Sequence, residues 1–354
     1  MEKYYSKAIN FYFVLVTNHK GSFIRFILGL LVMFAGSSLF SADWETVTEN
    51  LAKKEKAGYG GICGVLVDHT NGHVFLNISD KGHFRSTDRG ASFTPFSTPF
   101  KGRTEWPGCF NFDPTEKTNR LVTALVYGSP ILVGDRKGSD WSVLGNKSVH
   151  MDWCVLDWAA ADPKCIFAFK HESGGVLLRS MDGGKTYSEI GKGFASAWVF
   201  DEKVAVVTQA KTKTQPNPKL MRTTDSGDTW SPVADFTTDA LPKWRNGKLY
   251  WVVENALITT TDNGATWTKV SDLKNVKLGP IFGKKQGHLF VLTKAGISES
   301  FDDGKTWGKS IPLPKELKGW SALTWLDYDP INDILYILKM GSELFRLHRT
   351  QGEG

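Results

Sequence analysis

The chain has 354 residues, of which 41% are hydrophobic and 23% charged, and its formal net charge is +6. This composition supplies the apolar side chains for a sizeable core and is not that of a disordered chain. Acidic and basic residues are interspersed, without a basic tail or an amphipathic basic helix, which argues against a nucleic-acid partner.

Residues 1–42 are typical of a secretory signal peptide. Four basic residues precede an apolar run from Phe26 to Phe40, and small residues follow that run. The alternative is a membrane anchor, but the run is shorter than the roughly 20 residues of a spanning helix. We therefore expect a secreted or periplasmic protein consisting of residues 43–354, attached to a membrane only if the segment is not cleaved.

An eight-residue pattern, Ser/Thr-x-Asp-x-Gly-x-Ser/Thr-aromatic, recurs along the rest of the chain. Two β-type runs precede each copy and a short strand follows it. The five full copies are Ser86–Phe93, Ser180–Tyr187, Thr223–Trp230, Thr260–Trp267 and Ser300–Trp307. The long gap after the first copy predicts an imperfect sixth copy at Gly134–Trp141, which contains one extra residue.

Repeated groups of four short strands are typical of the blades of a β-propeller. The six units that carry the pattern are followed by a seventh that lacks its last strand. Trp44–Val47 has the sequence of such a last strand, so we expect the N-terminal strand to complete this unit. The predicted fold is all-β, a seven-bladed propeller with four-stranded antiparallel blades. Closure by the N-terminal strand would leave no unpaired edge.

The repeated aspartates are expected to be structural rather than catalytic. The pattern spans the turn between the third and fourth strands, where glycine supplies a positive φ and the carboxylate accepts backbone N–H bonds. The aromatic residue is expected to pack between blades. The six aspartates are Asp88, Asp135, Asp182, Asp225, Asp262 and Asp302.

The pattern resembles the Asp-box, or bacterial neuraminidase, repeat, and the chain is similar to that superfamily from about Trp44 to Arg349. Its members include sialidases, xyloglucanase-type glycoside hydrolases, sortilin-type receptors and photosystem II assembly-factor propellers. The resemblance implies the propeller fold and leaves the function open.

Two members of the superfamily match only in part. Sialidases carry three arginines around the sugar carboxylate, one of them in an Arg-Ile-Pro motif, and no such motif occurs in this sequence. A true sialidase is therefore disfavoured. Gly58–Phe93 resembles the opening blade of xyloglucanase-type enzymes. Those enzymes have two propellers with the substrate cleft between them, whereas this chain has room for one.

Ligands of propellers usually lie over the channel, at the end where the first strands begin, and we expect the site there. Tyr59 and the loop residue Tyr127 are expected at the same end. Aromatic rings suit stacking on sugar faces, and charged groups bind hydroxyls. The alternative is that the tryptophans pack between inner strands. The candidate ligand-binding residues are Arg103, Glu105, Trp106, His150, Trp153, Trp198, Trp244 and Arg245.

The candidate catalytic residues are Asp152, His171 and Glu172. Two carboxylates could perform general acid/base cleavage of a glycoside, and the same residue types could instead hold a divalent cation. The alternative is that they are solvated loop residues in ordinary ion pairs. The sequence contains no phosphate loop and no H-E-x-x-H motif, and we expect no cofactor and no metal.

Three cysteines, Cys63, Cys109 and Cys154, occupy equivalent first-strand positions, 46 and 45 residues apart. Such a register raises the possibility of a metal site, but small residues are also what crowded inner strands need, and packing is the favoured interpretation. Cys165 lies on a neighbouring strand, where a disulfide to Cys154 is a further option.

The leading functional hypothesis is an exported propeller that binds or processes a glycan over the channel mouth. One alternative is a non-catalytic scaffold that binds a protein partner on the same face. Another is a divergent exo-sialidase or other glycoside hydrolase. Whether the protein is an enzyme stays open, and we expect a monomer.

Overall fold

The computed structural model describes residues 43–96, 101–127, 131–144, 150–317, 319 and 321–349. The predicted signal peptide, residues 1–42, lies outside this part of the chain. None of the helices in the described part has the length and apolar content of a membrane span.

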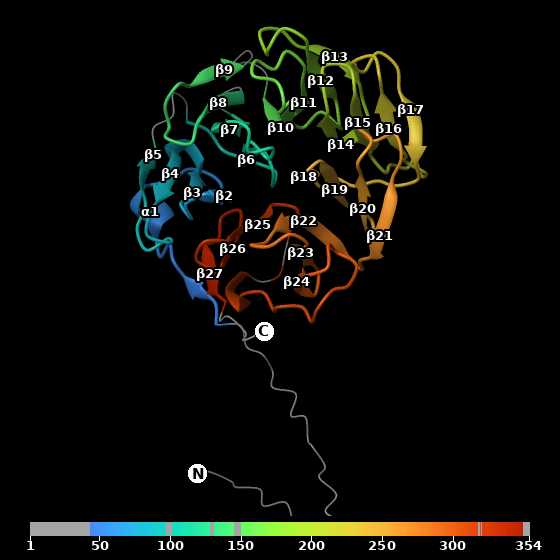
Figure 1. Cartoon of the computed structure of the whole chain (residues 1–354). Helices are drawn as coiled ribbons and strands as arrows, with labels where there is room; N and C mark the ends of the chain where they lie inside the picture. The colour runs from blue at the N-terminus through green and yellow to red at the C-terminus, as the bar shows by residue number, and fades with distance from the viewer. Residues whose placement is uncertain are drawn as a thin grey trace, which may run out of the picture. The chain divides into compact units, whose positions relative to one another are not determined.

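Within these residues, seven antiparallel sheets form a ring, as the sequence predicts (Figure 1). The innermost strands, in order of blade, are β2 (Ile62–Val67), β6 (Phe110–Phe112), β10 (Met151–Leu156), β14 (Phe194–Val199), β18 (Lys243–Arg245), β22 (Val276–Phe282) and β25 (Thr324–Asp329). The second strands are β3 (Val74–Ile78), β7 (Arg120–Thr123), β11 (Ile166–Lys170), β15 (Ala205–Gln209), β19 (Lys248–Val253), β23 (Leu289–Thr293) and β26 (Ile334–Lys339).

The outer part of each blade follows the same order. The third strands are β4 (Gly82–Ser86), β8 (Ile131–Asp135), β12 (Leu177–Ser180), β16 (Leu220–Thr223), β20 (Ala256–Thr260), β24 (Gly296–Ser300) and β27 (Phe345–His348). The fourth strands are β5 (Thr94–Phe96), β9 (Ser142–Leu144), β13 (Ser188–Gly191), β17 (Ser231–Ala234), β21 (Thr268–Asp272) and, in the seventh blade, β1 (Glu45–Thr46). The helices are the short α1 (Leu51–Lys54), η1 (Ser79–Lys81) and η2 (Lys315–Leu317).

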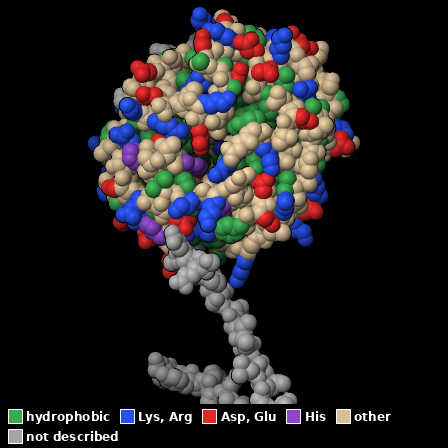
Figure 2. All heavy atoms as spheres, in the orientation of Figure 1, with side chains coloured by type: hydrophobic (Ala, Val, Ile, Leu, Met, Phe, Trp, Pro, Cys, Tyr) green, Lys and Arg blue, Asp and Glu red, His purple; other side chains and the backbone are tan. Residues whose placement is uncertain are grey.

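The two faces of the ring differ in what they carry. We call the face where the innermost strands begin the strand-start face. The opposite face, where these strands end and the eight-residue turns lie, is the hairpin face. Figure 2 shows one face of the ring, on which acidic and basic side chains are interspersed around a small hollow near the centre.

The N-terminal strand closes the ring, and this prediction is confirmed. In β1, Glu45 and Thr46 pair with Arg346 and Phe345 of β27. The register continues beyond the strand, because the Val47 amide donates to the Leu344 carbonyl over 3.0 Å. The last blade therefore contains both ends of the described chain.

Blade 6 departs from the predicted four strands, since its sheet contains three in the described part of the chain. Beyond β24, Ile311 forms a two-bond bridge to Ile297, with N–O distances of 2.9 and 2.8 Å. Pro312 and Pro314 follow. The Gly308 amide also donates to the Glu299 carbonyl of β24 over 2.8 Å. Proline has no N–H to donate to a ladder, so regular pairing does not continue beyond Ile311.

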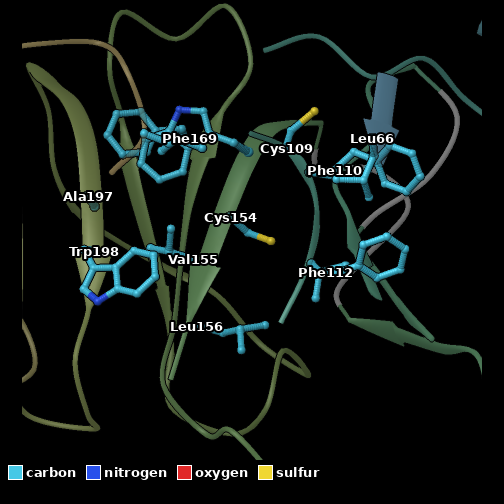
Figure 3. Packing of buried hydrophobic residues seen from close by; sticks show 14 of the residues in the cluster. Leu66, Cys109, Phe110, Phe112, Cys154, Val155, Leu156, Phe169, Ala197 and Trp198 are labelled. Atoms are coloured by element: carbon cyan, nitrogen blue, oxygen red, sulfur yellow. The ribbon is translucent and has the colours of Figure 1, made fainter. Parts of the chain in front are cut away.

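Side chains between adjacent blades supply the core. Phe75 of β3 makes edge-to-face contacts with Phe96, Phe110 and Phe112, at centroid distances of 5.0, 6.5 and 5.5 Å. Such pairs add to the stabilisation from apolar burial. The same kind of packing continues between blades 3 and 4, where Val155 and Trp198 lie side by side (Figure 3).

The eight-residue turns are held by their aspartates. Asp225 accepts hydrogen bonds from the Thr229 amide and hydroxyl, at 2.9 and 2.6 Å, and from the Thr223 hydroxyl at 2.6 Å. Asp135 accepts the corresponding bonds from Ser139, at 2.8 and 2.7 Å. The imperfect sixth copy therefore keeps the four-residue spacing from aspartate to hydroxyl.

These bonds predict an acid-sensitive contribution to stability. The Thr223 and Thr229 hydroxyls lower the pKa of Asp225 to about 2. A carboxyl with a lowered folded-state pKa stabilises the fold above its unfolded pKa of ~3.9, and this contribution is lost as the pH falls towards 2. We expect Asp225→Asn to lower Tm at about pH 5 and to lose this effect near pH 2.

Asp228→Asn is the matched control, because its exposed carboxylate lies in the same turn and pairs with Arg179 on the surface. Exposed pairs contribute about 0–1 kcal/mol. A Tm difference between Asp225→Asn and the native protein that stays constant from about pH 5 to about pH 2 would contradict the prediction.

Candidate functional site

The three candidate catalytic residues come together on the strand-start face, in blade 3. His171 Nδ1 lies 2.5 Å from Asp152 Oδ1, and His171 Nε2 lies 3.7 Å from Glu172 Oε1. The imidazole also reaches blade 2, since Nε2 is 2.9 Å from the Tyr127 hydroxyl. The sequence predicts that Tyr127 lies on this face but gives it no role in the site. In the structure it lies at the centre of the group.

Hydrogen bonds link the members of this group. A neutral imidazole has one donor and one acceptor nitrogen. In the tautomer in which Nδ1 donates to Asp152, Nε2 accepts from the Tyr127 hydroxyl. Burial raises the pKa of Asp152, the hydrogen bond from His171 opposes that shift, and the charges of Glu105 and Glu172 add to it. The result is a hydrogen-bonded chain from carboxylate to imidazole to phenol.

Arg103 and Glu105 form the part of the site that belongs to blade 2. Arg103 Nη2 lies 2.7 Å from Glu105 Oε2. The Arg103 guanidinium also lies over two aromatic rings, 4.9 Å from the centroid of Tyr59 and 5.2 Å from that of Tyr127. Cation–π contacts of this kind hold the rings in place.

The two tyrosines present their rings to solvent. Tyr59 is 81% exposed and Tyr127 is 53% exposed. His150 packs edge-to-face against Tyr127, with the ring centroids 5.1 Å apart. We call Tyr59, Arg103, Tyr127, His150 and His171 the aromatic platform. It joins blades 1, 2 and 3 on the strand-start face.

The candidate tryptophans do not belong to this platform. Trp153 is 3% exposed and stacks on Phe169, with centroids 3.9 Å apart. Trp198 is 6% exposed and stacks on Trp244 at 6.3 Å. Trp106 is half-buried and packs against the core. These tryptophans pack against the core, as the alternative interpretation of the sequence expects.

Trp244 and Arg245 lie at the other end of the ring from the place where the sequence puts them. The strand that carries them, β18, has three residues, and the tight turn at Asn246 and Gly247 follows at once. A residue near the start of so short a strand is also near its end. Both side chains consequently line a cavity on the hairpin face.

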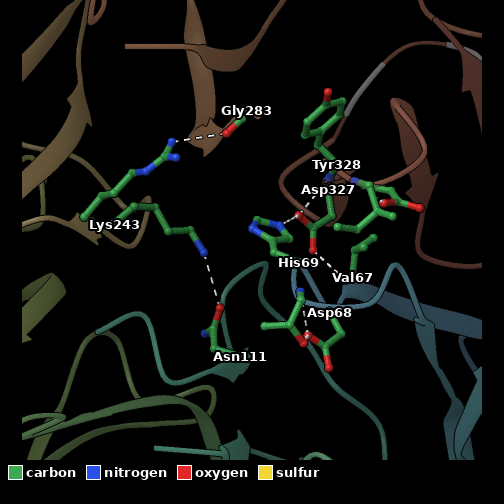
Figure 4. A network of polar contacts seen from close by, with 12 residues as sticks. Val67, Asp68, His69, Asn111, Lys243, Gly283, Asp327 and Tyr328 are labelled. Atoms are coloured by element: carbon green, nitrogen blue, oxygen red, sulfur yellow. Dashed lines mark hydrogen bonds and ion pairs between the residues drawn. The ribbon is translucent and has the colours of Figure 1, made fainter. Parts of the chain in front are cut away.

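This cavity has a volume of about 390 Å³ and is lined by blades 1, 2, 5, 6 and 7. Across it, Lys243 Nζ of blade 5 donates to Asn111 Oδ1 of blade 2 over 3.3 Å (Figure 4). On the blade 7 side, Asp327 accepts from the Val67 amide at 2.7 Å and pairs with His69 at 3.3 Å. The sequence shows these segments as ordinary turns, so it contains no signal for the cavity.

All four cysteines are buried free thiols. Cys154 and Cys165 therefore form no disulfide. The Cys109 and Cys154 sulfur atoms do not point toward each other (Figure 3), and burial raises the pKa of Cys63 and Cys154 to about 12. In the described residues, no three His, Cys, Asp or Glu side chains are grouped so that they could hold a metal ion.

Comparisons with known proteins identify the fold. No family model matches the chain, and no curated protein matches it. A GH74 enzyme from Niastella koreensis is similar in structure, with a TM-score of 0.53 and 14% identity over 82% of this chain and 43% of that chain. The β-propeller domain of Cps50 (Swd1) from Myceliophteria thermophila has a TM-score of 0.52 and 10% identity over 82% of this chain and 97% of its own.

The chain thus spans less than half the length of the GH74 enzyme, and at these identities the likeness shows the propeller fold alone. A fold does not by itself determine a function, so the function has to be argued from the site.

Proposed function

We propose that this chain is an exported propeller of the Asp-box superfamily that binds a glycan on its strand-start face. The observation that carries the proposal is the aromatic platform. Two exposed tyrosine rings flank one arginine, and His150 and His171 lie beside them. Sugars present apolar faces that stack on such rings and hydroxyls that bind charged groups.

Each element of the platform has a part in this binding. Tyr59 and Tyr127 offer open ring faces for stacking. Glu105 is half-buried beside Arg103 and orients its guanidinium, as does the pairing with two rings. Arg103 and Glu172 supply a donor and an acceptor for hydroxyl groups. Export would bring the face to glycans outside the cytoplasm.

A glycan array is the test, with the affinity for any glycan that binds measured on variants of the platform. We expect Tyr59→Ala combined with Tyr127→Ala to weaken binding at least tenfold, because both stacking surfaces are removed. Phe301→Ala is the matched control, since Phe301 is an aromatic residue 69% exposed on the hairpin face. Absence of any bound glycan, or unchanged affinity in the double variant, would contradict the proposal.

A protein partner is the alternative occupant of the same face. Capture of one stoichiometric protein that is lost in the Tyr59→Ala, Tyr127→Ala variant, with no glycan bound, would favour that alternative.

Glycoside hydrolysis is a second candidate function, and one observation favours it. The bonded chain from Asp152 through His171 ends on a phenol hydroxyl that is open to solvent. In such a chain the carboxylate orients the imidazole, which accepts the proton of the hydroxyl. The Tyr127 oxygen would then attack the anomeric carbon, and Glu172, next to the imidazole, would protonate the oxygen of the leaving group.

Tyr127→Phe separates hydrolysis from binding, because it removes the hydroxyl and keeps the ring. If the candidate is right, hydrolysis of a chromogenic glycoside or sialoside falls at least 100-fold while glycan affinity is retained. Hydrolysis that survives in Tyr127→Phe, or a native protein that cleaves none of these substrates, would rule out this mechanism.

A further inference from the structure

The cavity on the hairpin face lies outside the platform and has the features of a second ligand site. Its volume of about 390 Å³ falls within the 300–1,000 Å³ of ligand pockets in proteins. Much of its wall is apolar. The apolar lining residues include Phe112, Pro280, Ile281 and Phe282.

The two buried carboxylates around this cavity are occupied within the protein. Asp113 accepts four hydrogen bonds, from the amides and hydroxyls of Thr115 and Thr118, at 2.6–3.0 Å. Asp327 accepts from the amides of Val67 and Tyr328 at 2.7 and 2.8 Å, besides its contact with His69. Of the lining acids, Glu116 alone is exposed.

The cations on the opposite wall, Lys243 and Arg245, have no carboxylate partner among the described residues. In the described part of the chain, no carboxylate lies within 4.0 Å of the Lys243 ammonium or the Arg245 guanidinium. Lys243 donates to the neutral amide of Asn111 (Figure 4), and Arg245 donates to the Gly283 carbonyl at 3.2 Å. A half-buried cation without a carboxylate in contact is costly. Burial lowers the pKa of Lys243, and the charge of Asp327 opposes that shift.

Lys243 and Arg245 act together because of their register. They are two residues apart on β18, and alternate residues of a strand leave it on the same side. The Arg245 guanidinium lies over the Phe282 ring, 5.2 Å from its centroid. Two donors and an aromatic wall thus border one space.

We propose that this cavity binds a small organic acid, with its carboxylate between Lys243 and Arg245 and its apolar body against Phe282 and Phe112. A carboxylate would supply the negative charge that both cations lack, through charge-assisted hydrogen bonds. If an inorganic anion occupied the cavity, the apolar wall would stay in contact with water. An acid with a hydrocarbon part would cover that wall.

Calorimetric titration of the whole protein with three probes tests the proposal. The probes are 4-phenylbutyrate, its neutral amide 4-phenylbutyramide, and phenyl phosphate. We expect 4-phenylbutyrate to bind at least tenfold more tightly than the amide. Equal affinity of acid and amide, no binding of the acid at millimolar concentration, or tighter binding of phenyl phosphate would overturn the proposal.

Variants locate the binding. Lys243→Met and Arg245→Met each keep an unbranched side chain and remove the charge, and we expect each to weaken binding of 4-phenylbutyrate at least tenfold. Lys219→Met is the matched control, since this lysine forms a surface pair with Asp235 away from the cavity. Unchanged affinity in both cavity variants would overturn the proposal.

Two cavity variants are used in case one of them misfolds. A fall in affinity is interpreted only for a variant whose thermal unfolding and circular dichroism match those of the native protein. If Lys243→Met fails this check, Arg245→Met decides. The Tyr59→Ala, Tyr127→Ala variant is expected to bind 4-phenylbutyrate normally, so this inference and the glycan proposal succeed or fail separately.

Discussion

A chain shortened to begin at residue 49 should unfold at a Tm roughly 5–10 °C below that of the chain with its N-terminal strand. The truncation removes β1 and leaves β27 as an unpaired edge. It also removes the Thr48 hydroxyl, which accepts from the buried Leu344 amide at 2.8 Å and donates to Glu343 at 2.7 Å. Leaving a buried donor unpaired costs about 1–3 kcal/mol.

The open edge should also promote association, because an unpaired strand offers its backbone groups to a second chain. Differential scanning calorimetry and light scattering measure the two effects. Thr48→Ala should reproduce part of the loss in Tm, whereas Thr46→Ala, in the exposed β1, should change Tm little. A truncated protein with the Tm of the longer one would show that the seventh blade does not need its outer strand.

Gly296→Ala should be among the most destabilising single substitutions outside the core, at about 3 kcal/mol or more. Gly296 has φ 137°, and a Cβ there would lie 2.1 Å from the Ile311 carbonyl oxygen. That oxygen belongs to the Ile297–Ile311 bridge, which covers the edge of blade 6 together with the bond from the Gly308 amide to the Glu299 carbonyl. The substitution therefore disrupts the backbone at the point where this blade lacks a fourth strand.

Two glycines separate the causes of this loss. A Cβ at Gly308 would lie 3.5 Å from its nearest neighbour, so Gly308→Ala should be nearly neutral. Gly247 has φ 78° with nothing within 4 Å, so Gly247→Ala should cost only the backbone strain, about 1–2 kcal/mol. Urea denaturation measures all three. A Gly296→Ala protein no less stable than Gly247→Ala would contradict the clash.

The propeller could be predicted from the sequence because its turns are defined by local chemistry. Each eight-residue copy contains both the aspartate and the hydroxyl that it binds, as Asp225 and Thr229 show. Even the sixth copy follows this rule, because Asp135 and Ser139 keep their spacing. Counting such turns gives six of the seven blades, and the strands after the last turn, together with Trp44–Val47, predict the seventh.

The candidate site could be predicted only in part. Asp152, His171 and Glu172 meet because they flank one pair of strands. Tyr127 comes from the neighbouring blade. It is a loop residue with φ 53°, a backbone conformation that sequence patterns do not reveal. The sequence does not reveal that β18 has only three residues, so Trp244 lies at the opposite end of the ring from its predicted position. The cavity depends on contacts between residues more than a hundred positions apart.

The contact between Asn111 and Lys243 has a mechanical consequence. Blades 2 and 5 are not neighbours in the ring, yet this bond joins them, and a Cβ at Gly108 of blade 2 would lie only 2.6 Å from Leu241 Cδ1 beside blade 5. These contacts join opposite sides of the ring. The ring therefore cannot widen without breaking the hydrogen bond between Asn111 and Lys243.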